Sequence, residues 1–511
     1  MSNAETILTL LDRGRADAPA ILAPGRPPLT FGALRAQARD TVASLNALGI
    51  GRNDRVGIVL PNGPEMATAF IGIASGATTA PLNPAYRAEE FDFYLSDLGA
   101  KALVVEEGST SPALEVARAR SIPIVTLRVP EGAPAGAFTL SGPSTGQAKA
   151  TGQAGTDDIA LVLHTSGTTS RPKIVPLSHR NICATARNIR ETLALTPDDR
   201  CLNIMPLFHI HGLMAAVASS LSAGASVFAT PGFNALKFFA WLDEAQPTWY
   251  TAVPTMHQAI LARAERNADS VARAKLRFIR SSSSSLPPQV MAELERVFRA
   301  PVIEAYGMTE AAHQMASNPL PPRPRKPGTV GLAAGPEIAI MDEAGNLLPP
   351  GAIGEIVIRG ENVTAGYEAN PKANASAFTN GWFRTGDQGS IDADGYITIT
   401  GRLKEIINRG GEKISPREVD EVLMDHPAVA QAVTFAMPHD KLGEEVAAAI
   451  VLREGKSATD REIRDFVATR LADFKVPRKV VILDEIPKGA TGKLQRIGLH
   501  EKLADRLGAT P

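Results

Sequence analysis

The alternation of helix-like and strand-like segments near the N-terminus restricts the fold most strongly. Three segments with helical spacing of apolar residues alternate with three short apolar runs, in the order 31–48, 55–60, 64–75, 80–82, 88–98 and 101–105. A repeated strand–helix–strand order gives a parallel sheet with helices on both faces. We therefore predict an α/β fold. Residues 108–155 are rich in Gly, Ala, Pro and Ser, and we expect most of them to form a long surface connection.

Size and charge narrow the class of protein. A chain of 511 residues exceeds one ordinary core, so two or more domains are expected. The net charge of −1 argues against a nucleic-acid footprint and against a basic membrane patch. Neither a signal peptide nor an apolar run of membrane-spanning length is visible. The two cysteines, Cys183 and Cys201, have no metal-binding spacing, which favours buried thiols in a reducing cytoplasmic setting.

The stretch 165–173 reads Thr-Ser-Gly-Thr-Thr-Ser-Arg-Pro-Lys and follows an apolar run at 159–164. Hydroxyl groups, backbone N–H groups and positive charge are what a polyphosphate needs. The stretch lacks the G-x-x-x-x-G-K-[ST] pattern, so it is not a Walker A loop. A solvated turn between the strand and a helix at 179–195, N-capped by Ser178, explains the stretch equally well when it is seen alone.

Polar side chains also follow later apolar segments. His209 and His211 would share a face if their segment is extended, and there they could face an anion or bind a metal. A strand at 276–280 runs into five serines at 281–285, which favours a tight polar turn over a flexible linker because a helix follows at once. A further strand at 301–306 leads into Gly-Met-Thr-Glu-Ala-Ala-His.

The last third of the chain has a different pattern. A β-rich section begins near 355, and an Asp-Gly hairpin turn precedes a strand at 396–400. Two helix patterns and two strand patterns follow, at 416–424, 429–435, 446–452 and 460–471. They indicate a compact α+β unit of ordinary domain size. We predict an N-terminal domain at 1–401, a hinge at 402–404 and a C-terminal domain at 405–511.

Five motifs in order make the chain similar to the adenylate-forming acyl-CoA synthetase superfamily, also called the AMP-binding or ANL enzymes. The motifs are 165–173, Tyr306-Gly-Met-Thr-Glu310, Thr385-Gly-Asp387, Gly401-Arg402 and Pro487-Lys-Gly-Ala-Thr-Gly-Lys493. Within the superfamily the chain most resembles the plant and fungal oxalyl-CoA synthetases, through the stretches 206–212, 248–255, 276–286 and 407–416. The resemblance implies an ATP-dependent acid–thiol ligase that converts oxalate and CoA to oxalyl-CoA through an acyl-adenylate, releasing AMP and pyrophosphate. It also implies a large N-terminal domain with mainly parallel sheets and a β-rich subdomain, and a small mobile C-terminal domain.

The resemblance further implies which residues bind ATP. The expected phosphate-binding residues are Thr165, Ser166, Gly167, Thr168, Thr169 and Lys173. Tyr306 would stack near the adenine, Thr309 would contact the α-phosphate, and Glu310 would bind Mg²⁺. Asp387 would accept both ribose hydroxyls, with Arg402 beside the ribose.

Catalysis is expected to rest on Lys493, Thr309, Glu310 and His209. Lys493 would bridge the carboxylate substrate and the AMP phosphate, where positioned cations and Mg²⁺ offset the charge that builds up. The family swings its small domain between the two half-reactions, and Lys404 occupies the hinge position. Gly410, Gly411 and Glu412 would then reach the CoA channel.

Polar residues surround the expected acyl group. The predicted acyl-binding residues are His209, His211, Ser282, Ser283, Ser284 and His313. Like-charge repulsion between two carboxylates about 4 Å apart is on the order of 4 kcal/mol at an effective dielectric near 20, and hydroxyl and imidazole donors can offset it. A fatty or aromatic acid would leave these donors unpaired, at a cost of about 1–3 kcal/mol each. This chemistry does not distinguish oxalate from malonate or glycolate.

Three alternatives remain at this stage. The same chemistry could act on malonate, another short acid or 4-coumarate. The chain could instead load a separate carrier protein, or bind nucleotide without catalysis, although the joint presence of Lys493, Glu310, Asp387 and Lys173 weighs against the last. We expect small-molecule partners (oxalate, ATP and CoA), no nucleic acid, no membrane, and a monomer or small homo-oligomer.

Overall fold

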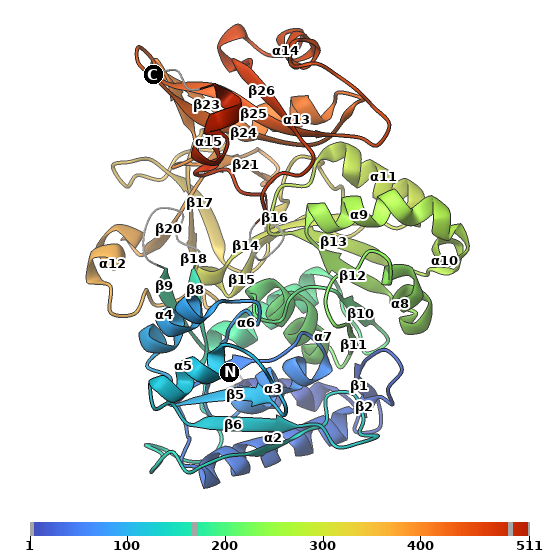
Figure 1. The fold of residues 1–511 in the computed structure, drawn as a ribbon, viewed down its shortest axis with the longest axis vertical. Helices are drawn as coiled ribbons and strands as arrows, with labels where there is room; N and C mark the ends of the chain where they lie inside the picture. Colours follow the sequence, from blue (N-terminus) through green and yellow to red (C-terminus); the bar gives the residue numbers. More distant parts are fainter. Residues whose placement is uncertain (1–4, 166–171, 489–493, 509–511) are drawn as a thin grey trace.

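The computed structural model describes residues 5–165, 172–488 and 494–508. Strands within these residues form four sheets, and Figure 1 shows the last of them lying apart at the C-terminal end of an elongated molecule. Two of the sheets are mainly parallel, the third is antiparallel, and the C-terminal sheet is mixed. The predicted α/β class, with a large N-terminal part and a smaller C-terminal unit, is confirmed.

The first parallel sheet is the one that the alternating pattern predicts. Its strands lie in the order β7 (Thr139–Ser141), β6 (Ile124–Arg128), β5 (Ala102–Glu106), β3 (Arg55–Val59), β4 (Thr78–Pro81), β8 (Ile159–Thr165) and β9 (Lys173–Ser178). Helices α2 (Phe31–Ala47) and α3 (Pro64–Ala74) cover one face, and α4 (Ala88–Leu98) covers the other. The helices and strands lie within a residue or two of their predicted positions.

The expected long surface connection at 108–155 is wrong in part. Helix α5 (Ala113–Ala119) and strands β6 and β7 lie within it and extend the sheet. Val125 and Leu127 of β6 are fully buried, and β6 pairs in parallel with β5. Strand β6 was missed in the sequence because it has only two buried apolar side chains and lies among many Gly, Ala and Pro residues.

The second parallel sheet carries the ends of several predicted site segments. Its strands lie in the order β16 (Leu332–Ala333), β15 (His313–Ser317), β14 (Val302–Met308), β13 (Phe278–Ser282), β12 (Trp249–Ala252), β10 (Arg200–Asn203), β11 (Ser226–Ala229), β1 (Pro19–Leu22) and β2 (Leu29–Thr30). β12, β13 and β14 run parallel, so their carboxyl ends meet at one edge of the sheet. Open α/β sheets bind ligands outside this edge.

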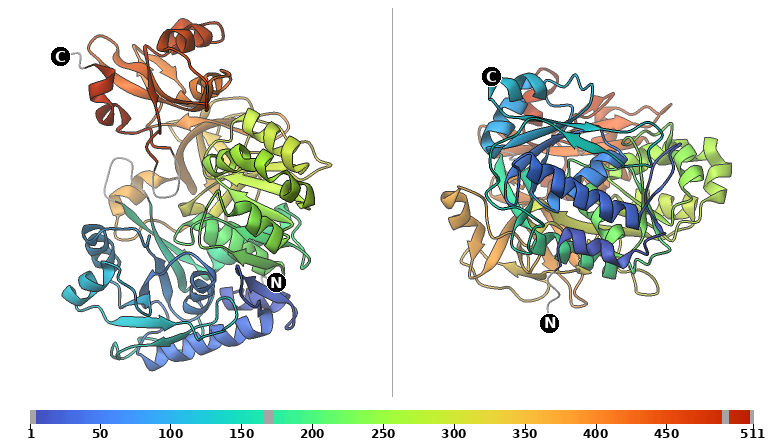
Figure 2. Two further views of the ribbon diagram at one scale, coloured as in Figure 1. Left: turned by 45° about the vertical axis from the view of Figure 1, so that its right-hand side comes forward. Right: turned by 90° about the horizontal axis from the view of Figure 1, so that it is seen from below.

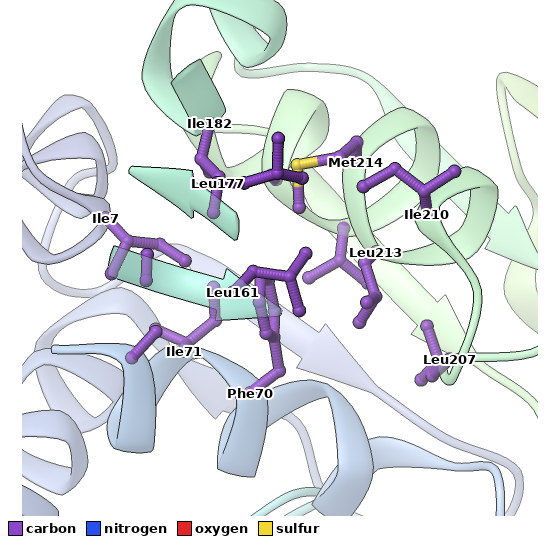
Figure 3. Packing of buried hydrophobic residues seen from close by; sticks show 14 of the residues in the cluster. Ile7, Phe70, Ile71, Leu161, Leu177, Ile182, Leu207, Ile210, Leu213 and Met214 are labelled. Atoms are coloured by element: carbon purple, nitrogen blue, oxygen red, sulfur yellow. The ribbon is translucent and has the colours of Figure 1, made fainter. Parts of the chain in front are cut away.

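Figure 3 shows how the core positions the histidine segment. Leu161 of the first sheet lies between Phe70 of α3 and Leu213, two residues after His211, and Leu177 lies on the neighbouring strand. The residues from His211 to Ala218 form a π-helix and are all buried. The extended conformation considered for this segment is therefore wrong. Its apolar residues form a helix that packs against the core.

Helices of the second sheet and short connecting helices complete the large part of the molecule (Figures 1 and 2). They are α1 (Ile7–Leu10), α6 (His179–Thr192), α7 (Ser219–Ser222), α8 (Phe238–Ala245), α9 (Pro254–Ala264), α10 (Ala268–Arg273), α11 (Pro288–Phe298) and α12 (Pro371–Ala377). Ser178 caps α6, as predicted. Within the described residues, no helix is both long and apolar enough to cross a membrane.

The remaining two sheets follow one another along the chain. The antiparallel sheet contains β17 (Glu337–Met341), β18 (Gly354–Arg359), β19 (Phe378–Thr379), β20 (Trp382–Ile391) and β21 (Ile397–Arg402). The C-terminal sheet contains β22 (Ile407–Arg409), β23 (Glu412–Ile414), β24 (Val429–His439), β25 (Gly443–Leu452) and β26 (Lys479–Leu483), with helices α13 (Pro416–Met424), α14 (Asp460–Ala468), α15 (Leu499–Lys502) and α16 (Ala504–Leu507). In Figure 2 this unit sits at the end of the molecule, above the carboxyl edge of the second sheet.

Candidate active site

Three of the predicted nucleotide-binding residues meet at the junction of two sheets. The Tyr306 hydroxyl, at the end of β14, donates a hydrogen bond to the Asp387 carboxylate on β20. The Arg402 Nε on β21 lies 3.3 Å from Asp387 Oδ1, because Asp387 and Arg402 are opposite each other in the β20–β21 pair. Burial and the neighbouring carboxylate raise the pKa of Tyr306, and Asp387 raises the pKa of Arg402. Asp387 thus has a phenol hydroxyl donor on one side and a guanidinium on the other.

The predicted Mg²⁺ ligand lies close by. Glu310 follows β14 in a short 3₁₀ turn, Thr309–Ala311, and its carboxyl group accepts a 2.8 Å hydrogen bond from the Tyr367 hydroxyl. Burial raises the pKa of Glu310. The Lys173 Nζ lies 4.1 Å from the centre of the Tyr367 ring. Tyr367 therefore links a cation and a carboxylate that are far apart in sequence, and a single tyrosine in a Gly-Tyr-Glu stretch gives no signal of this role.

Strands β8 and β9 bring the two ends of the phosphate motif together. The strands are antiparallel, and Thr165 lies directly opposite Lys173. The motif therefore connects two strands rather than a strand and a helix, and α6 begins only after β9. Five predicted residues lie outside the described part of the chain: Ser166, Gly167, Thr168, Thr169 and Lys493.

The predicted acyl-binding residues gather around His211. The His211 Nδ1 lies 3.0 Å from the Ser283 Oγ, and its Nε2 lies 2.6 Å from the Thr251 Oγ1. The imidazole of His313 stacks on that of His211, with ring centres 5.0 Å apart and an interplanar angle of 23°. Four segments distant in sequence thus place two imidazoles and two hydroxyl groups at the carboxyl edge of the second sheet.

The other predicted acyl-binding residues have different surroundings. The Ser282 hydroxyl donates to the Ala305 carbonyl, and the exposed Ser284 hydroxyl donates to the Ser283 carbonyl. The His209 Nδ1 accepts from the backbone N–H of His211 at 3.2 Å. Among the described residues, no group of three His, Cys, Asp or Glu side chains could hold a metal ion, so the metal alternative for the histidine pair has no support.

Arg280 is a residue of this site that the sequence interpretation missed. Its side chain is fully buried on β13 and reaches Thr251 Oγ1 and Gln314 Oε1 at 3.5 and 3.4 Å. No carboxylate of the described residues pairs with it. Burial lowers the pKa of Arg280 to about 9, so the guanidinium remains charged at neutral pH. An arginine inside an apolar strand next to a serine run is unusual enough to have indicated this role.

Glu304 is a second buried charged residue near the site. It lies on β14, its Oε1 accepts from the Leu286 N–H at 3.2 Å, and burial raises its pKa from 4.5 to about 7. The Arg417 charge on α13 opposes this rise. The folded state therefore binds a proton between pH 4.5 and 7 that the unfolded state has already lost.

We expect Glu304→Gln to remove this pH dependence. Stability contributed by the protonated Glu304 is fully present below pH 4.5 and lost as pH rises to about 7. Denaturant unfolding should show the variant gaining up to about 3 kcal/mol on the natural protein between pH 4.5 and pH 8. Glu293→Gln, an exposed change on α11, is the control. If Glu304→Gln and the natural protein lost the same stability between pH 4.5 and pH 8, the raised pKa of Glu304 would be contradicted.

The predicted hinge residue lies between the third and fourth sheets, and the predicted CoA-channel residues lie in the first hairpin of the fourth sheet. Lys404 is exposed, and the backbone N–H of Leu403 beside it donates to the Gly386 carbonyl at 2.9 Å. Gly410 and Gly411 form the turn between β22 and β23, with φ of 60° and 101°. Such angles favour glycine, so this hairpin turn depends on both residues.

Tyr306 and Glu310 at β14, Asp387 on β20 and Lys173 on β9 come from three sheets, and together they form a site suited to a nucleotide. Residues 12–368 match the AMP-binding enzyme family, and residues 418–493 match the AMP-binding enzyme C-terminal domain. The chain belongs to the AMP-binding enzyme family.

Two curated relatives are similar over most of their length. The chain is 48% identical to an oxalate–CoA ligase of Arabidopsis thaliana over 453 residues, which is 88% of each chain. It is 44% identical to an oxalate–CoA ligase of Saccharomyces cerevisiae over 478 residues, covering 89% of this chain and 87% of the relative.

A solved structure shares both fold and domain arrangement. The ATP-bound crystal structure of MatB from Rhodopseudomonas palustris is 30% identical, covers 98% of this chain and 99% of its own, and superimposes with a TM-score of 0.88. The apo crystal structure of the same protein gives 0.78 at the same identity and coverage. As a whole, the fold of this chain is therefore more similar to the ATP-bound structure than to the apo structure.

Proposed function

We propose that this protein is an ATP-dependent oxalate–CoA ligase that releases AMP and pyrophosphate. The observation that carries the proposal is Arg280, a buried cation that pairs with no carboxylate of the described residues. Its guanidinium contacts the Thr251 hydroxyl and the His211 imidazole. A doubly charged small acid compensates such a cation, whereas an apolar acid leaves it uncompensated. The two oxalate–CoA ligases similar over most of their length support the same acid.

In the proposed reaction a carboxylate oxygen attacks the α-phosphorus of ATP and pyrophosphate leaves. Asp387 accepts the ribose hydroxyls while Tyr306 lies against the adenine, and Lys173 and residues 165–169 hold the phosphates. Lys493 and Thr309 act at the α-phosphate, with His209 beside the acid. The CoA thiol then attacks the acyl carbon, the bond to AMP breaks, and AMP leaves with the oxygen that joined them.

Glu310 is the residue that would hold Mg²⁺. Mg²⁺ in nucleotide sites is commonly bound through one or two carboxylates together with substrate phosphates. Glu310 fits this requirement because it is a carboxylate held in place by Tyr367, close to Lys173. The ion would neutralise charge on the phosphates.

The second half-reaction requires CoA to reach the adenylate. We propose that the chain divides at 1–401, 402–404 and 405–511, and that rotation about Lys404 brings Gly410, Gly411 and Glu412 to the CoA channel. The exposed Lys404 and the glycine turn between β22 and β23 suit such a movement. The two buried free cysteines suit a reducing cytoplasmic setting, and we propose a monomer or small homo-oligomer.

The acid is tested by AMP formation with ATP, Mg²⁺ and CoA on oxalate, malonate, acetate, octanoate and 4-coumarate. We expect a strong preference for oxalate. Arg280→Met should raise the KM for oxalate roughly tenfold or more, because the second carboxylate of the acid loses the attraction of a buried unit charge. Methionine fills much of the buried volume, although Gln314 Oε1 loses the guanidinium as a donor.

Two further results make this test decisive. Arg273→Met, at an exposed arginine on α10, should leave the KM for oxalate unchanged. Arg280→Met should retain its weak rate with acetate, which carries a single charge. Preference for malonate would favour the same ligase chemistry on another short acid. Preference for octanoate or 4-coumarate would contradict the proposed polar environment of the acid. Transfer to a carrier protein but not to CoA would favour the carrier-loading alternative.

A further inference from the structure

Four polar groups behind the acyl pocket form a continuous hydrogen-bonded line. The Arg280 Nη1 lies 3.5 Å from both Thr251 Oγ1 and His211 Nε2, Thr251 Oγ1 lies 2.6 Å from His211 Nε2, and His211 Nδ1 lies 3.0 Å from Ser283 Oγ. Arg280, Thr251 and His211 are fully buried, and Ser283 is half-buried. The line therefore begins at a cation inside the protein and ends at the half-buried Ser283 hydroxyl, one of the predicted acyl-binding groups.

The direction of each hydrogen bond follows from the cation. A guanidinium has donors only, so Thr251 Oγ1 and His211 Nε2 can only accept from Arg280. The hydroxyl hydrogen of Thr251 then has one partner among the described residues, His211 Nε2, and it donates there. A proton on Nε2 would face the guanidinium N–H groups and would leave the buried Thr251 hydrogen unpaired. His211 thus carries its ring proton on Nδ1.

This protonation determines what Ser283 offers to a ligand. The Nδ1–H of His211 donates to Ser283 Oγ, so the hydroxyl hydrogen of Ser283 is available to an acceptor in the pocket. Ser283 also adopts a φ of 75°, which is costly for a residue other than glycine. Strained backbone of this kind is concentrated at functional sites.

We propose that Arg280 and Thr251 are positioning residues that fix the Nδ1–H tautomer of His211 and thereby present the Ser283 hydroxyl as a donor to a carboxylate oxygen of the substrate. The proposal rests on the proposed function for the identity of the acid. The tautomer itself is a property of the ligand-free protein. The site selects acids whose second group accepts hydrogen bonds.

The first test measures the tautomer directly. Long-range ¹H–¹⁵N correlation spectra of the full-length, ¹⁵N-histidine-labelled protein distinguish the two neutral tautomers and the imidazolium, and the His211 signal is the one missing from His211→Asn. We expect Nδ1 protonated and Nε2 unprotonated in the absence of ligand. A protonated Nε2, alone or together with Nδ1, would overturn the proposal whatever acid the enzyme uses.

The second test breaks the line at a residue remote from the substrate. Thr251→Val keeps the shape and removes the hydroxyl, so we expect a mixed His211 tautomer and a roughly tenfold higher KM for oxalate with the KM for ATP unchanged. Thr251→Ser keeps the hydroxyl and should restore both. An unchanged tautomer in Thr251→Val, or equal increases in both KM values, would show a purely structural role for Thr251.

Discussion

Replacing Lys493 with alanine is expected to reduce the rate of oxalate-dependent pyrophosphate release by about 10² to 10³, the usual cost of removing one positioned electrostatic group. Two anions approach each other in this step, and the lysine charge stabilises the transition state more than the bound substrates. ATP binding should therefore be largely kept. Hydrolysis or thiolysis of a preformed oxalyl-adenylate should also continue, because that step does not bring oxalate to the α-phosphate.

The described residues on either side of 489–493 are anchored to the C-terminal unit. Lys488 and Leu494 form an isolated antiparallel bridge, and the Gln495 N–H donates a hydrogen bond to the Pro487 carbonyl at 3.0 Å. Arg496 binds Glu405, next to the predicted hinge, at 3.2 Å and Asp420 on α13 at 2.8 Å. These contacts tie Lys488 and residues 494–496 to the body of the C-terminal unit.

Lys488→Ala provides the matched control for this variant. Lys488 lies in the same segment, but its ammonium group pairs with the exposed Glu485 at 2.7 Å. Its loss should leave pyrophosphate release within about twofold of the natural rate, since exposed ion pairs contribute little. Equal rates for Lys493→Ala and the natural protein would remove Lys493 from the mechanism.

The second large effect is expected from Asp387→Asn. The variant keeps the size of the side chain but replaces one acceptor oxygen by a donor, so only one ribose hydroxyl can still be accepted. A hydrogen bond to a charged group contributes about 1.5–3 kcal/mol, so the KM for ATP should rise roughly 10- to 100-fold. The KM for oxalate should change little, because Asp387 lies among the nucleotide residues Tyr306 and Arg402.

Asp394→Asn is the control for the nucleotide prediction. Asp394 lies on the exposed turn after β20 and pairs with Lys326 at 2.7 Å. Steady-state kinetics with ATP varied at saturating oxalate should show no change for this variant. A similar rise in the KM for oxalate in Asp387→Asn would indicate a general disturbance of the fold instead of a lost ribose contact.

The sequence predicted elements best where a local signal existed. The spacing of apolar residues defined α2, α3 and α4, and Ser178 defined the start of α6. Residues 113–141 were missed because their helix and strands are short and surrounded by glycine and proline. The His211 segment was misjudged because its helical conformation depends on core contacts made by residues such as Leu213 and Met214.

Site residues show the same dependence on long-range contacts. Motifs indicated Tyr306, Glu310 and Asp387 because their order along the chain is specific to the family. Tyr367 and Arg280 carry no such motif, and their roles follow from partners 57 and 34 positions away in sequence. Their functional importance becomes visible only when the sheets bring these partners together.

Oxygen-isotope transfer tests the central claim most directly. Oxalate labelled with oxygen-18 in all carboxylate positions would be incubated with the protein, ATP, Mg²⁺ and CoA, and the nucleotide product analysed by mass spectrometry. An acyl-adenylate route predicts AMP that carries one oxygen-18 atom on its phosphate, formed together with oxalyl-CoA. Unlabelled AMP, or label that appears in inorganic phosphate with ADP as the nucleotide product, would contradict the account.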